Sequence, residues 1–266
     1  MRKTNELLDL SGKTAVVTGG GVGIGYGISY RLAEAGANVV IAERNENGSK
    51  AAEKLAALGF AVKFVKTDVS VEADVKNLMG QTVKLYGSID ILINNAGIYP
   101  TIPVMQMTLS DFDNVLNVNL KGAFLCTKYA SEVMIARKTG GKIINITSID
   151  ALHPSSIGLA HYDASKHGLW GFTKNSALEL APYNICVNAI APGGVLTPGV
   201  EHMQRSTPSL AEMDPKKILD AMINKIPMKR LGDPDDIGKV ALFLASDMSS
   251  YMTGSQIVVD GGVLLA

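Results

Sequence analysis

The chain has 266 residues, of which 47% are hydrophobic, so its length suits one α/β domain or two small ones. Its 25 Lys and Arg residues balance 25 Asp and Glu residues, so no basic surplus indicates a nucleic-acid or membrane-surface partner. The N-terminal segment lacks the apolar core of a signal peptide, and no apolar run approaches the roughly 20 residues of a membrane-spanning helix. We therefore expect a cytoplasmic protein with no nucleic-acid or membrane partner.

The residue types that bind transition metals are few and scattered. Cys126 and Cys186 lie far apart in apolar stretches, outside any CxxC spacing. The four His residues form no zinc-binding pattern either. We expect two buried free thiols and no metal site.

Short β-branched and apolar runs recur along the chain and predict seven strands. Their near-continuous apolarity is typical of strands that are covered on both faces, as in a parallel sheet. The runs lie at 14–18, 38–42, 61–66, 89–94, 142–147, 184–190 and 256–259.

Longer helical patterns separate these runs, among them 22–36, 46–59, 71–87, 120–138 and 163–181. Strand–helix alternation of this kind implies right-handed βαβ crossovers. No linker, composition break or internal repeat divides the chain, so residues 1–266 are expected to form a single domain. The expected fold class is α/β, with a doubly wound, mostly parallel, seven-stranded sheet and helices on both faces.

The segment 193–230 departs from this alternation. It is rich in Gly, Pro and Met, with one plausible helix near 215–224. An insertion close to the carboxyl edge of a sheet suits a mobile lid over a binding site. A loop with no role in binding is the alternative.

The first strand runs directly into a glycine-rich turn, and a helix follows. Glycines let the backbone turn tightly and approach a pyrophosphate, while the helix N-terminus presents unpaired N–H groups to the anion. This turn, after the first of several alternating strands, predicts a dinucleotide site. Its sequence is Thr18-Gly19-Gly20-Gly21-Val22-Gly23-Ile24-Gly25.

The TGxxxGxG spacing of the turn resembles that of the short-chain dehydrogenase/reductase family, whose sheet is of the Rossmann type. Further motifs of that family follow in order over about 12–262: Asp68-Val69, Asn94-Asn95-Ala96-Gly97, Pro192-Gly193 with Val195 and Thr197, and Asp260-Gly261-Gly262 after Gly254. The resemblance implies an oxidoreductase that transfers hydride to or from a nicotinamide cofactor.

The resemblance also implies roles for these motifs. The acid at 68 would contact the adenine, the Asn-Asn-Ala-Gly element would help to hold the sheet and cofactor pocket, and the Pro-Gly motif would lie on the nicotinamide side. The implied cofactor-binding residues are Gly19, Gly21, Val22, Gly23, Ile24, Gly25, Glu43, Arg44, Asp68, Val69, Asn95, Ala96, Gly97, Tyr162, Lys166, Pro192, Gly193, Val195 and Thr197.

The end of the second strand bears on the choice of cofactor. An acid there, Glu43, can accept hydrogen bonds from both ribose hydroxyls and would repel a 2′-phosphate. Val22 occupies a position that is frequently Arg or Lys in NADP-using relatives. Arg44 favours the opposite choice, because its guanidinium could pair with the extra phosphate. We expect NAD, with NADP as the alternative.

Tyr162 and Lys166 are four residues apart at the start of a predicted helix, so both side chains share one face. An adjacent ammonium favours the phenolate and is expected to bring the pKa of the tyrosine nearer neutrality. The resemblance implies that Tyr162 is the general acid/base and Lys166 its activator and a ribose ligand. It implies that Ser148, at the end of the fifth strand, anchors the substrate. It makes Asn119 part of a water-linked proton relay to the lysine.

Other polar residues flank these positions. His153 could face the substrate, whereas His161 and Asp163 could cap the helix or face a neighbouring subunit. Asp150 and His167 also lie nearby in the sequence. The expected pocket-lining residues on loop and lid are Tyr99, His202, Met203 and Met213.

Three functions follow from these patterns. The expected one is an NAD(H)-dependent, metal-free dehydrogenase or reductase of a sugar, polyol, hydroxy acid or cyclic alcohol. An NADPH-dependent 3-oxoacyl-thioester reductase would share its fold and catalytic residues, but Glu43 and Val22 count against it. A non-catalytic nicotinamide-sensing protein would tolerate loss of Tyr162 or Lys166, and both are present. The resemblance also implies a homotetramer built through the helices near 105–138 and 161–181.

Overall fold

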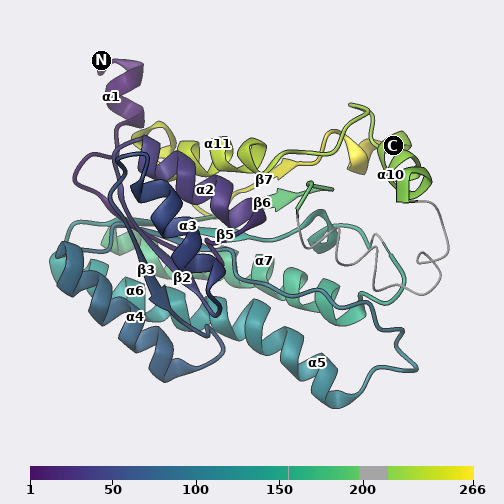
Figure 1. Cartoon of the computed structure of the whole chain (residues 1–266). Coiled ribbons are helices and arrows are strands. Elements are labelled where there is room, and N and C mark those ends of the chain that lie inside the picture. Colours follow the sequence, from purple (N-terminus) through teal and green to yellow (C-terminus); the bar gives the residue numbers. More distant parts are fainter. Residues whose placement is uncertain (155, 198–214) are drawn as a thin grey trace.

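The apolar runs form one seven-stranded sheet in the computed structural model, which describes residues 1–154, 156–197 and 215–266 (Figure 1). Neighbouring strands pair in parallel, in the spatial order β3-β2-β1-β4-β5-β6-β7. The predicted α/β fold is confirmed, and no strand end differs from its prediction by more than two residues. The strands are β1 (Thr14–Thr18), β2 (Asn38–Glu43), β3 (Val62–Lys66), β4 (Ile91–Asn94), β5 (Gly141–Ile146), β6 (Ile185–Pro192) and β7 (Gln256–Val259).

The order of the strands defines a switch point next to β1. The chain adds β2 and β3 on one side of β1, and then β4 to β7 on the other side. In doubly wound sheets, ligands bind where the carboxyl ends of two such strands diverge. The loops that follow β1 and β4 therefore carry the residues best placed for a ligand.

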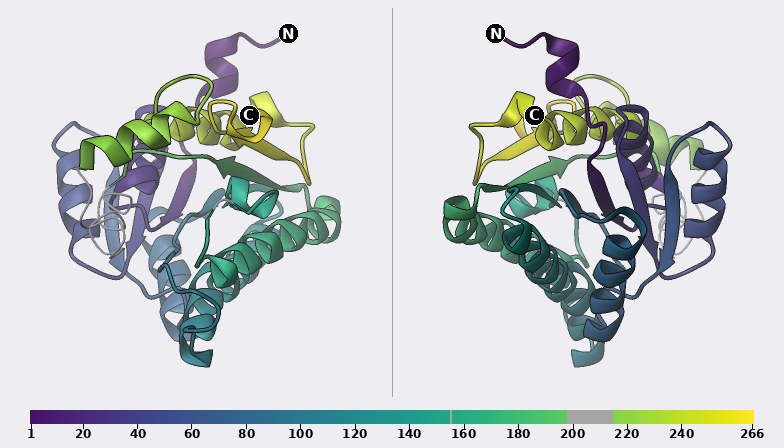
Figure 2. Two further views of the ribbon diagram at one scale, coloured as in Figure 1. Left: turned by 90° about the vertical axis from the view of Figure 1, so that its right-hand side faces the viewer. Right: turned by 90° about the vertical axis from the view of Figure 1, so that its left-hand side faces the viewer.

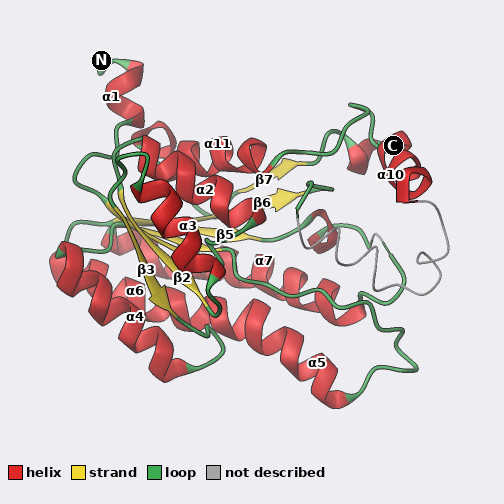
Figure 3. Ribbon diagram, in the orientation of Figure 1, coloured by secondary structure: helices red, strands yellow, loops and turns green. Residues whose placement is uncertain are grey.

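Helices cover both faces of the sheet, as the side views of Figure 2 and the red helices of Figure 3 show. One face carries α2 (Gly23–Glu34), α3 (Asn47–Ala56) and α11 (Pro234–Ala245), and the other carries α4 (Glu72–Tyr86), α6 (Gly122–Arg137) and α7 (Ala160–Leu180). The other described helices and helical turns are α1 (Thr4–Leu8), α5 (Leu109–Leu116), the π-helical turn η1 (Asn117–Lys121), α10 (Pro215–Asn224), and the 3-10 turns η2 (Ile149–Ala151), η3 (Ala181–Tyr183), η4 (Asp247–Ser249) and η5 (Val263–Leu265).

The central strand shows why continuous apolar runs suit this architecture. Successive side chains of a strand point to opposite faces. Ala15 and Val17 accordingly pack under α2, α3 and α11, whereas Val16 packs under α4, α6 and α7. All three are fully buried, which for a Val side chain stabilises the fold by about 1.5–3 kcal/mol.

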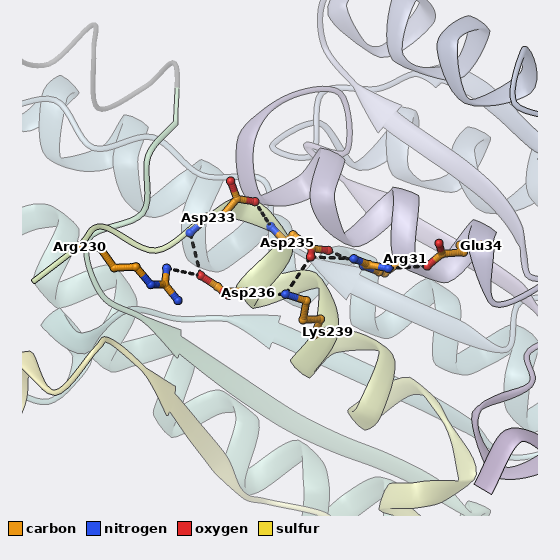
Figure 4. A network of polar contacts seen from close by, with 7 residues as sticks. All are labelled: Arg31, Glu34, Arg230, Asp233, Asp235, Asp236 and Lys239. Carbon is orange, nitrogen blue, oxygen red and sulfur yellow. Dashed lines mark hydrogen bonds and ion pairs between the residues drawn. The ribbon is translucent and has the colours of Figure 1, made fainter. Parts of the chain in front are cut away.

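The backbones of helices α2 and α11 are in direct contact. A Cβ on Gly27 would lie 2.6 Å from the Pro234 carbonyl oxygen, and one on Gly238 would lie 2.7 Å from the Gly27 carbonyl oxygen. An ion pair extends this contact, because the guanidinium of Arg31 binds both carboxylate oxygens of Asp235 (Figure 4). Since α2 begins at the glycine-rich turn, α11 helps to hold the proposed dinucleotide helix in place.

The same network reaches the chain segment that precedes α11. The carboxylate of Asp236 accepts hydrogen bonds from the Asp233 backbone N–H (3.0 Å) and from Arg230 (2.7 Å), as Figure 4 shows. Lys239 lies 2.9 Å from Asp235 in the next turn. The start of α11 is therefore fixed both to α2 and to the end of the predicted lid.

The predicted lid segment is tied at its base. Val195 and Gly232 form an isolated parallel β-bridge, in which Leu196 N–H donates to the Gly232 carbonyl and Gly232 N–H donates to the Gly194 carbonyl, both at 2.9 Å. The predicted helix near 215–224 is present as α10. Residues 198–214 lie outside the described residues, and with them the predicted pocket residues His202, Met203 and Met213.

Candidate active site

The turn between β1 and α2 has no room for side chains. Gly19 adopts a φ of +62°, and a Cβ on Gly25 would lie only 2.0 Å from the Gly19 carbonyl oxygen. The helix begins at Gly23 with Val22 as its N-cap, and no side chain caps its first turn. The N–H groups of Gly23, Ile24 and Gly25 thus lie at an uncapped helix N-terminus, which attracts anions.

The loop after β4 packs against this turn. The amide of Asn95 donates to the carbonyl oxygens of Thr18 (2.9 Å) and Gly19 (3.0 Å). The Thr18 hydroxyl oxygen in turn accepts from the backbone N–H groups of Asn95 (3.0 Å) and Ala96 (3.1 Å). Asn95 and Ala96 therefore set the shape of the turn, and Gly97 continues the loop toward Lys166.

The predicted adenosine side lies at the ends of β2 and β3. A Cβ on Gly21 would lie 2.9 Å from Gly48 N, and one on Gly48 would lie 2.6 Å from Glu43 Cβ, so Glu43 adjoins the glycine-rich turn. Arg44 is exposed, and its Nη1 lies 3.9 Å from an oxygen of Asp68. This weak ion pair holds the guanidinium near the end of β3, so its charge is partly neutralised by Asp68.

Some of the remaining predicted cofactor residues pack inside the protein, and others lie at the edge of the site. Val69 is buried against the position of Gly122, whose added Cβ would lie 2.7 Å from a Val69 methyl group. Pro192 ends β6, and a Cβ on Gly193 would meet Asp260 at 2.7 Å. Packing thus accounts fully for Val69 and Gly193.

Val195 belongs to the hydrophobic core, whereas Thr197 lies toward the substrate side. Val195 is 4% exposed and packs with the cluster beneath α2 and α11. The side chain of Thr197 hydrogen-bonds Tyr99, whose ring meets that of Tyr162 edge-on at a centroid distance of 5.9 Å. Tyr99 therefore lies beside Tyr162, where the sequence predicts a pocket-lining residue.

The predicted chemical residues converge from β5 and α7. Ser148 follows β5, and its hydroxyl hydrogen-bonds the phenol of Tyr162 near the start of α7. Lys166 lies one helical turn further on, with its Nζ 5.6 Å from the centre of the Tyr162 ring. The structure thus brings the hydroxyl, the phenol and the ammonium together.

The ammonium of Lys166 is buried and held in place. The residue is 4% exposed, and its Nζ donates a 2.8 Å hydrogen bond to the Ile146 carbonyl oxygen at the end of β5. Burial lowers the pKa of Lys166 to about 8, against the opposing effect of the negative charge of Asp150. The group is therefore largely protonated at neutral pH, with donors free for a ligand.

The expected fall in the pKa of Tyr162 does not occur in this structure. Burial raises its pKa most, the nearby charges of Asp150 and Asp163 raise it further, and the hydrogen bond with Ser148 lowers it too little to compensate. The sequence-based expectation included Lys166 but not the two carboxylates or the burial.

Asn119 lies in an unusual turn, the π-helical turn η1 between α5 and α6. It is 1% exposed; its side chain exchanges two hydrogen bonds with the backbone of Ile98 (2.8 and 2.9 Å) and donates to the Ser165 hydroxyl (3.0 Å). π-Helical turns are rare and frequent at functional sites. A Cβ on Gly97 would lie 3.3 Å from Asn119 Oδ1 and 3.7 Å from Lys166 Nζ, so all three groups adjoin.

Three flanking residues differ in what they contact. The Nδ1 atom of buried His161 accepts a 3.0 Å hydrogen bond from the Tyr162 backbone N–H, which makes it a cap within the first turn of α7. Asp150 accepts a hydrogen bond from the Ser148 hydroxyl at 2.8 Å. Its position two residues after Ser148 was the only signal of this contact in the sequence. The ring nitrogen Nδ1 of His153 contacts the Pro154 carbonyl instead (2.9 Å).

The residues present fit a nicotinamide dinucleotide. The uncapped N-terminus of α2 suits a pyrophosphate, Glu43 suits the ribose hydroxyls, and Lys166 has donors left for the second ribose. In the described ranges, no group of three or more His, Cys, Asp or Glu side chains could hold a metal ion, and no helix is long and apolar enough to span a bilayer. The arrangement can exchange a proton with a substrate oxygen next to a bound dinucleotide.

Comparison with known proteins agrees with this geometry. A family model described as enoyl-(acyl carrier protein) reductase matches residues 20–264. The oxidoreductase UcpA of Salmonella typhimurium is 40% identical over 257 residues, 96% of each chain.

Solved structures give the same assignment. A short-chain type dehydrogenase/reductase from Mycobacterium marinum is 35% identical, with a TM-score of 0.88 over 98% of this chain and 99% of that one. A protein provisionally described as an NAD(P)-dependent gluconate 5-dehydrogenase from Beutenbergia cavernae, with NADP bound at low occupancy, is 33% identical, with a TM-score of 0.87 over 98% and 100%. The chain belongs to the short-chain dehydrogenase/reductase family of oxidoreductases.

Proposed function

We propose that this protein interconverts a secondary alcohol and its ketone, with Tyr162 as the general acid/base. The observation that carries the proposal is the convergence of the Tyr162 phenol with the Ser148 hydroxyl and the buried Lys166 ammonium, beside the glycine-rich turn. When bound, the nicotinamide accepts or supplies the hydride and, in its oxidised form, adds positive charge. A sugar, polyol, hydroxy acid or cyclic alcohol would be the substrate.

Each side chain has a distinct task in this proposal. In oxidation, the Tyr162 phenolate takes the proton of the substrate hydroxyl, while the Ser148 hydroxyl holds the same oxygen. The charge of Lys166 favours the phenolate, and its hydrogen bond to Ile146 keeps the ammonium beside the ring. Asn119 fixes Ile98 and Ser165 around the lysine and would lead protons from it to solvent through water.

NAD is the cofactor that the adenosine side favours. Glu43 would repel a 2′-phosphate, and the ion pair of Arg44 with Asp68 competes with such a phosphate for the guanidinium. The likeness to a structure with NADP bound keeps NADP as the alternative.

A panel of polyols, sugars and hydroxy acids, tested with NAD and NADP by absorbance of the reduced cofactor, tests the proposal. We expect turnover of at least one alcohol with NAD, and none by the Tyr162→Phe variant. Cofactor binding without turnover of any alcohol or ketone would instead indicate the sensing protein. The likeness to the 3-oxoacyl-[acyl-carrier-protein] reductase FabG of Thermotoga maritima, 37% identical over 257 residues, keeps a 3-oxoacyl-thioester reductase as second candidate. The panel therefore includes an acetoacetyl thioester with NADPH.

We also propose that the protein is a homotetramer in the cytoplasm. An exposed, mainly apolar groove runs between η1, α6 and α7, lined by Leu116, Leu120, Phe124, Gly168 and Phe172 among others. Such a surface suits burial against a second copy. Light scattering that finds only a 28 kDa species would overturn the tetramer. The location rests on free thiols at Cys126 and Cys186, which suit a reducing compartment.

A further inference from the structure

A polar cluster adjoins the catalytic residues and has no task in the chemistry above. Asp150 lies in η2, two residues after Ser148. Its Oδ2 accepts a 2.8 Å hydrogen bond from the Ser148 hydroxyl, and its backbone N–H donates a 3.1 Å bond to the Ser148 oxygen. These two bonds fix the carboxylate next to the group that would hold the substrate oxygen.

The second oxygen of this carboxylate is buried without a partner. Asp150 is 7% exposed, and its Oδ1 has no hydrogen bond. Among the residues the structure describes, no Lys or Arg forms an ion pair with it; Lys166, the nearest cation considered above, donates to Ile146. A buried acceptor without a donor is unfavourable and unusual. A ligand that supplies the missing donor would relieve this.

The carboxylate of Asp163, the residue after Tyr162, also has a buried oxygen without a partner, Oδ1. Burial raises the pKa of Asp163, and the charge of Asp150 raises it further, so the two carboxylates are within electrostatic reach of each other. The surroundings of Tyr162 thus hold two carboxyl groups beside the single ammonium of Lys166.

We propose that Asp150 determines substrate specificity by accepting a hydrogen bond from a donor on the carbon next to the reacting carbinol. This inference rests on the proposed function, which places the substrate oxygen on Ser148 and Tyr162. Because Oδ2 of Asp150 lies 2.8 Å from the Ser148 hydroxyl, a substrate oxygen held on Ser148 would bring its neighbouring carbon close to this carboxylate. The favoured substrates are vicinal diols, as found in polyols and sugars; an amino alcohol presents the same donor chemistry.

The charge of Asp150 would also select against substrates that carry a carboxylate. An ionised carboxylate only accepts hydrogen bonds, and it repels another carboxylate held close to it. A hydroxy acid with its carboxylate one carbon from the carbinol would face Asp150 and Asp163 together. Such acids are therefore the disfavoured members of the proposed substrate range.

A matched series isolates this interaction. Four alcohols share a CH₃–CH(OH)–CH₂–X frame, in which X is hydrogen (propan-2-ol), hydroxyl (propane-1,2-diol), ammonium (1-aminopropan-2-ol) or carboxylate (3-hydroxybutyrate). We expect kcat/KM of the diol to exceed that of propan-2-ol by about tenfold or more, since hydrogen bonds to charged groups are strong. The hydroxy acid should be the poorest substrate. The amino alcohol separates a hydroxyl preference from a general preference for donors.

Asp150→Asn is the decisive variant, because it removes the charge at nearly constant shape. It should bring the diol close to parity with propan-2-ol and raise the relative rate of 3-hydroxybutyrate, with a smaller change for propan-2-ol itself. Asp150→Glu, which keeps the charge and moves the oxygen, should also lose the diol preference; it serves if the Asn variant does not fold. The exposed Asp113→Asn is the matched control and should retain the wild-type order.

A binding measurement separates failure of this inference from failure of the proposed function. Calorimetric titration of the diol into the complex with reduced cofactor requires no turnover. Diol binding that is lost in Asp150→Asn supports the inference even if no alcohol is oxidised. Oxidation of all four alcohols with the same ranking in wild type and Asp150→Asn would overturn the inference and leave the proposed function intact.

Discussion

The two turns at the carboxyl edge of the sheet achieve their function in opposite ways. The turn after β1 presents mainly backbone atoms, and a Cβ added to Gly25 would lie only 2.0 Å from the Gly19 carbonyl oxygen. The turn after β5 carries polar side chains, those of Ser148 and Asp150, which interact with each other and with Tyr162 of α7 through hydrogen bonds or charge. The first turn depends on the absence of side chains, and the second depends on the polar side chains that it carries.

This difference separates binding from chemistry. A backbone cradle can hold an anion that all nicotinamide dinucleotides share, but it contributes no side chain that could exchange a proton with a substrate. The side-chain turn contributes such groups, and it can be altered without changing the cradle. Substitutions in the two turns should therefore affect different kinetic constants.

The largest effect is expected from Tyr162→Phe, which removes only the phenol oxygen. Without a group to exchange the proton, kcat should fall by about a thousandfold or more. Cofactor affinity, followed by fluorescence titration, should stay within a factor of about three, because the cradle after β1 is untouched. The exposed Tyr183→Phe provides the control. Retention of most of the activity would show that another group is the acid/base.

Gly25→Ala should produce the converse pattern. Its new Cβ would collide with the Gly19 carbonyl, so the turn must open, and cofactor affinity should fall by about a hundredfold. Gly80→Ala is the matched control: this glycine is also helical, but its Cβ would have nothing within 4 Å. The control should bind cofactor normally and be about 0.5–1 kcal/mol more stable. Equal binding by both variants would disprove the cradle.

Glu43→Ala should change which cofactor is used without changing the chemistry. Removal of the acid removes the repulsion of a 2′-phosphate, so the ratio of kcat/KM with NADP to that with NAD should rise by about 10- to 100-fold. Glu53→Ala, an exposed acid on α3, should leave the ratio unchanged. An unaltered ratio in Glu43→Ala would place the ribose elsewhere.

Asp163→Asn should shift the pH dependence of alcohol oxidation. Burial raises the pKa of Tyr162 first, and the charges of Asp150, Tyr99 and Asp163 add to that effect, opposed by the ammonium of Lys166 in our proposal. Because oxidation requires the phenolate, kcat/KM should rise with pH. Loss of one negative charge lowers the pKa of Tyr162, so the rise should move to lower pH by up to about one unit. A shift in the other direction would contradict the assignment of these charges.

The sequence predicts the backbone turn better than the side-chain turn, for a physical reason. Glycine spacing, strand alternation and the four-residue interval from Tyr162 to Lys166 are local, so they are visible along the chain. The burial of Tyr162 and the charge of Asp150 at its side depend on how β5 and α7 pack, and no local pattern encodes them. Predicting the pKa of Tyr162 from Lys166 alone therefore gave the wrong direction.

Two structural elements illustrate the same limit. Helix α5 was not distinguished from its surroundings by periodicity, although Thr108 and Asp111 form a capping box at its start. Its continuation through the π-helical turn places Asn119 beside Ile98, and one extra residue in a helical turn leaves no signature in composition.

The bridge between Val195 and Gly232 has a consequence for how such an enzyme can change over time. It joins the two ends of the intervening stretch to each other by backbone hydrogen bonds. Replacement or lengthening of what lies between should leave the sheet, the dinucleotide turn and the proton-transfer groups as they are. We expect the contribution of this stretch to specificity, as distinct from that of Asp150, to be exchangeable between relatives, with Val195 and Gly232 as the junctions for grafting.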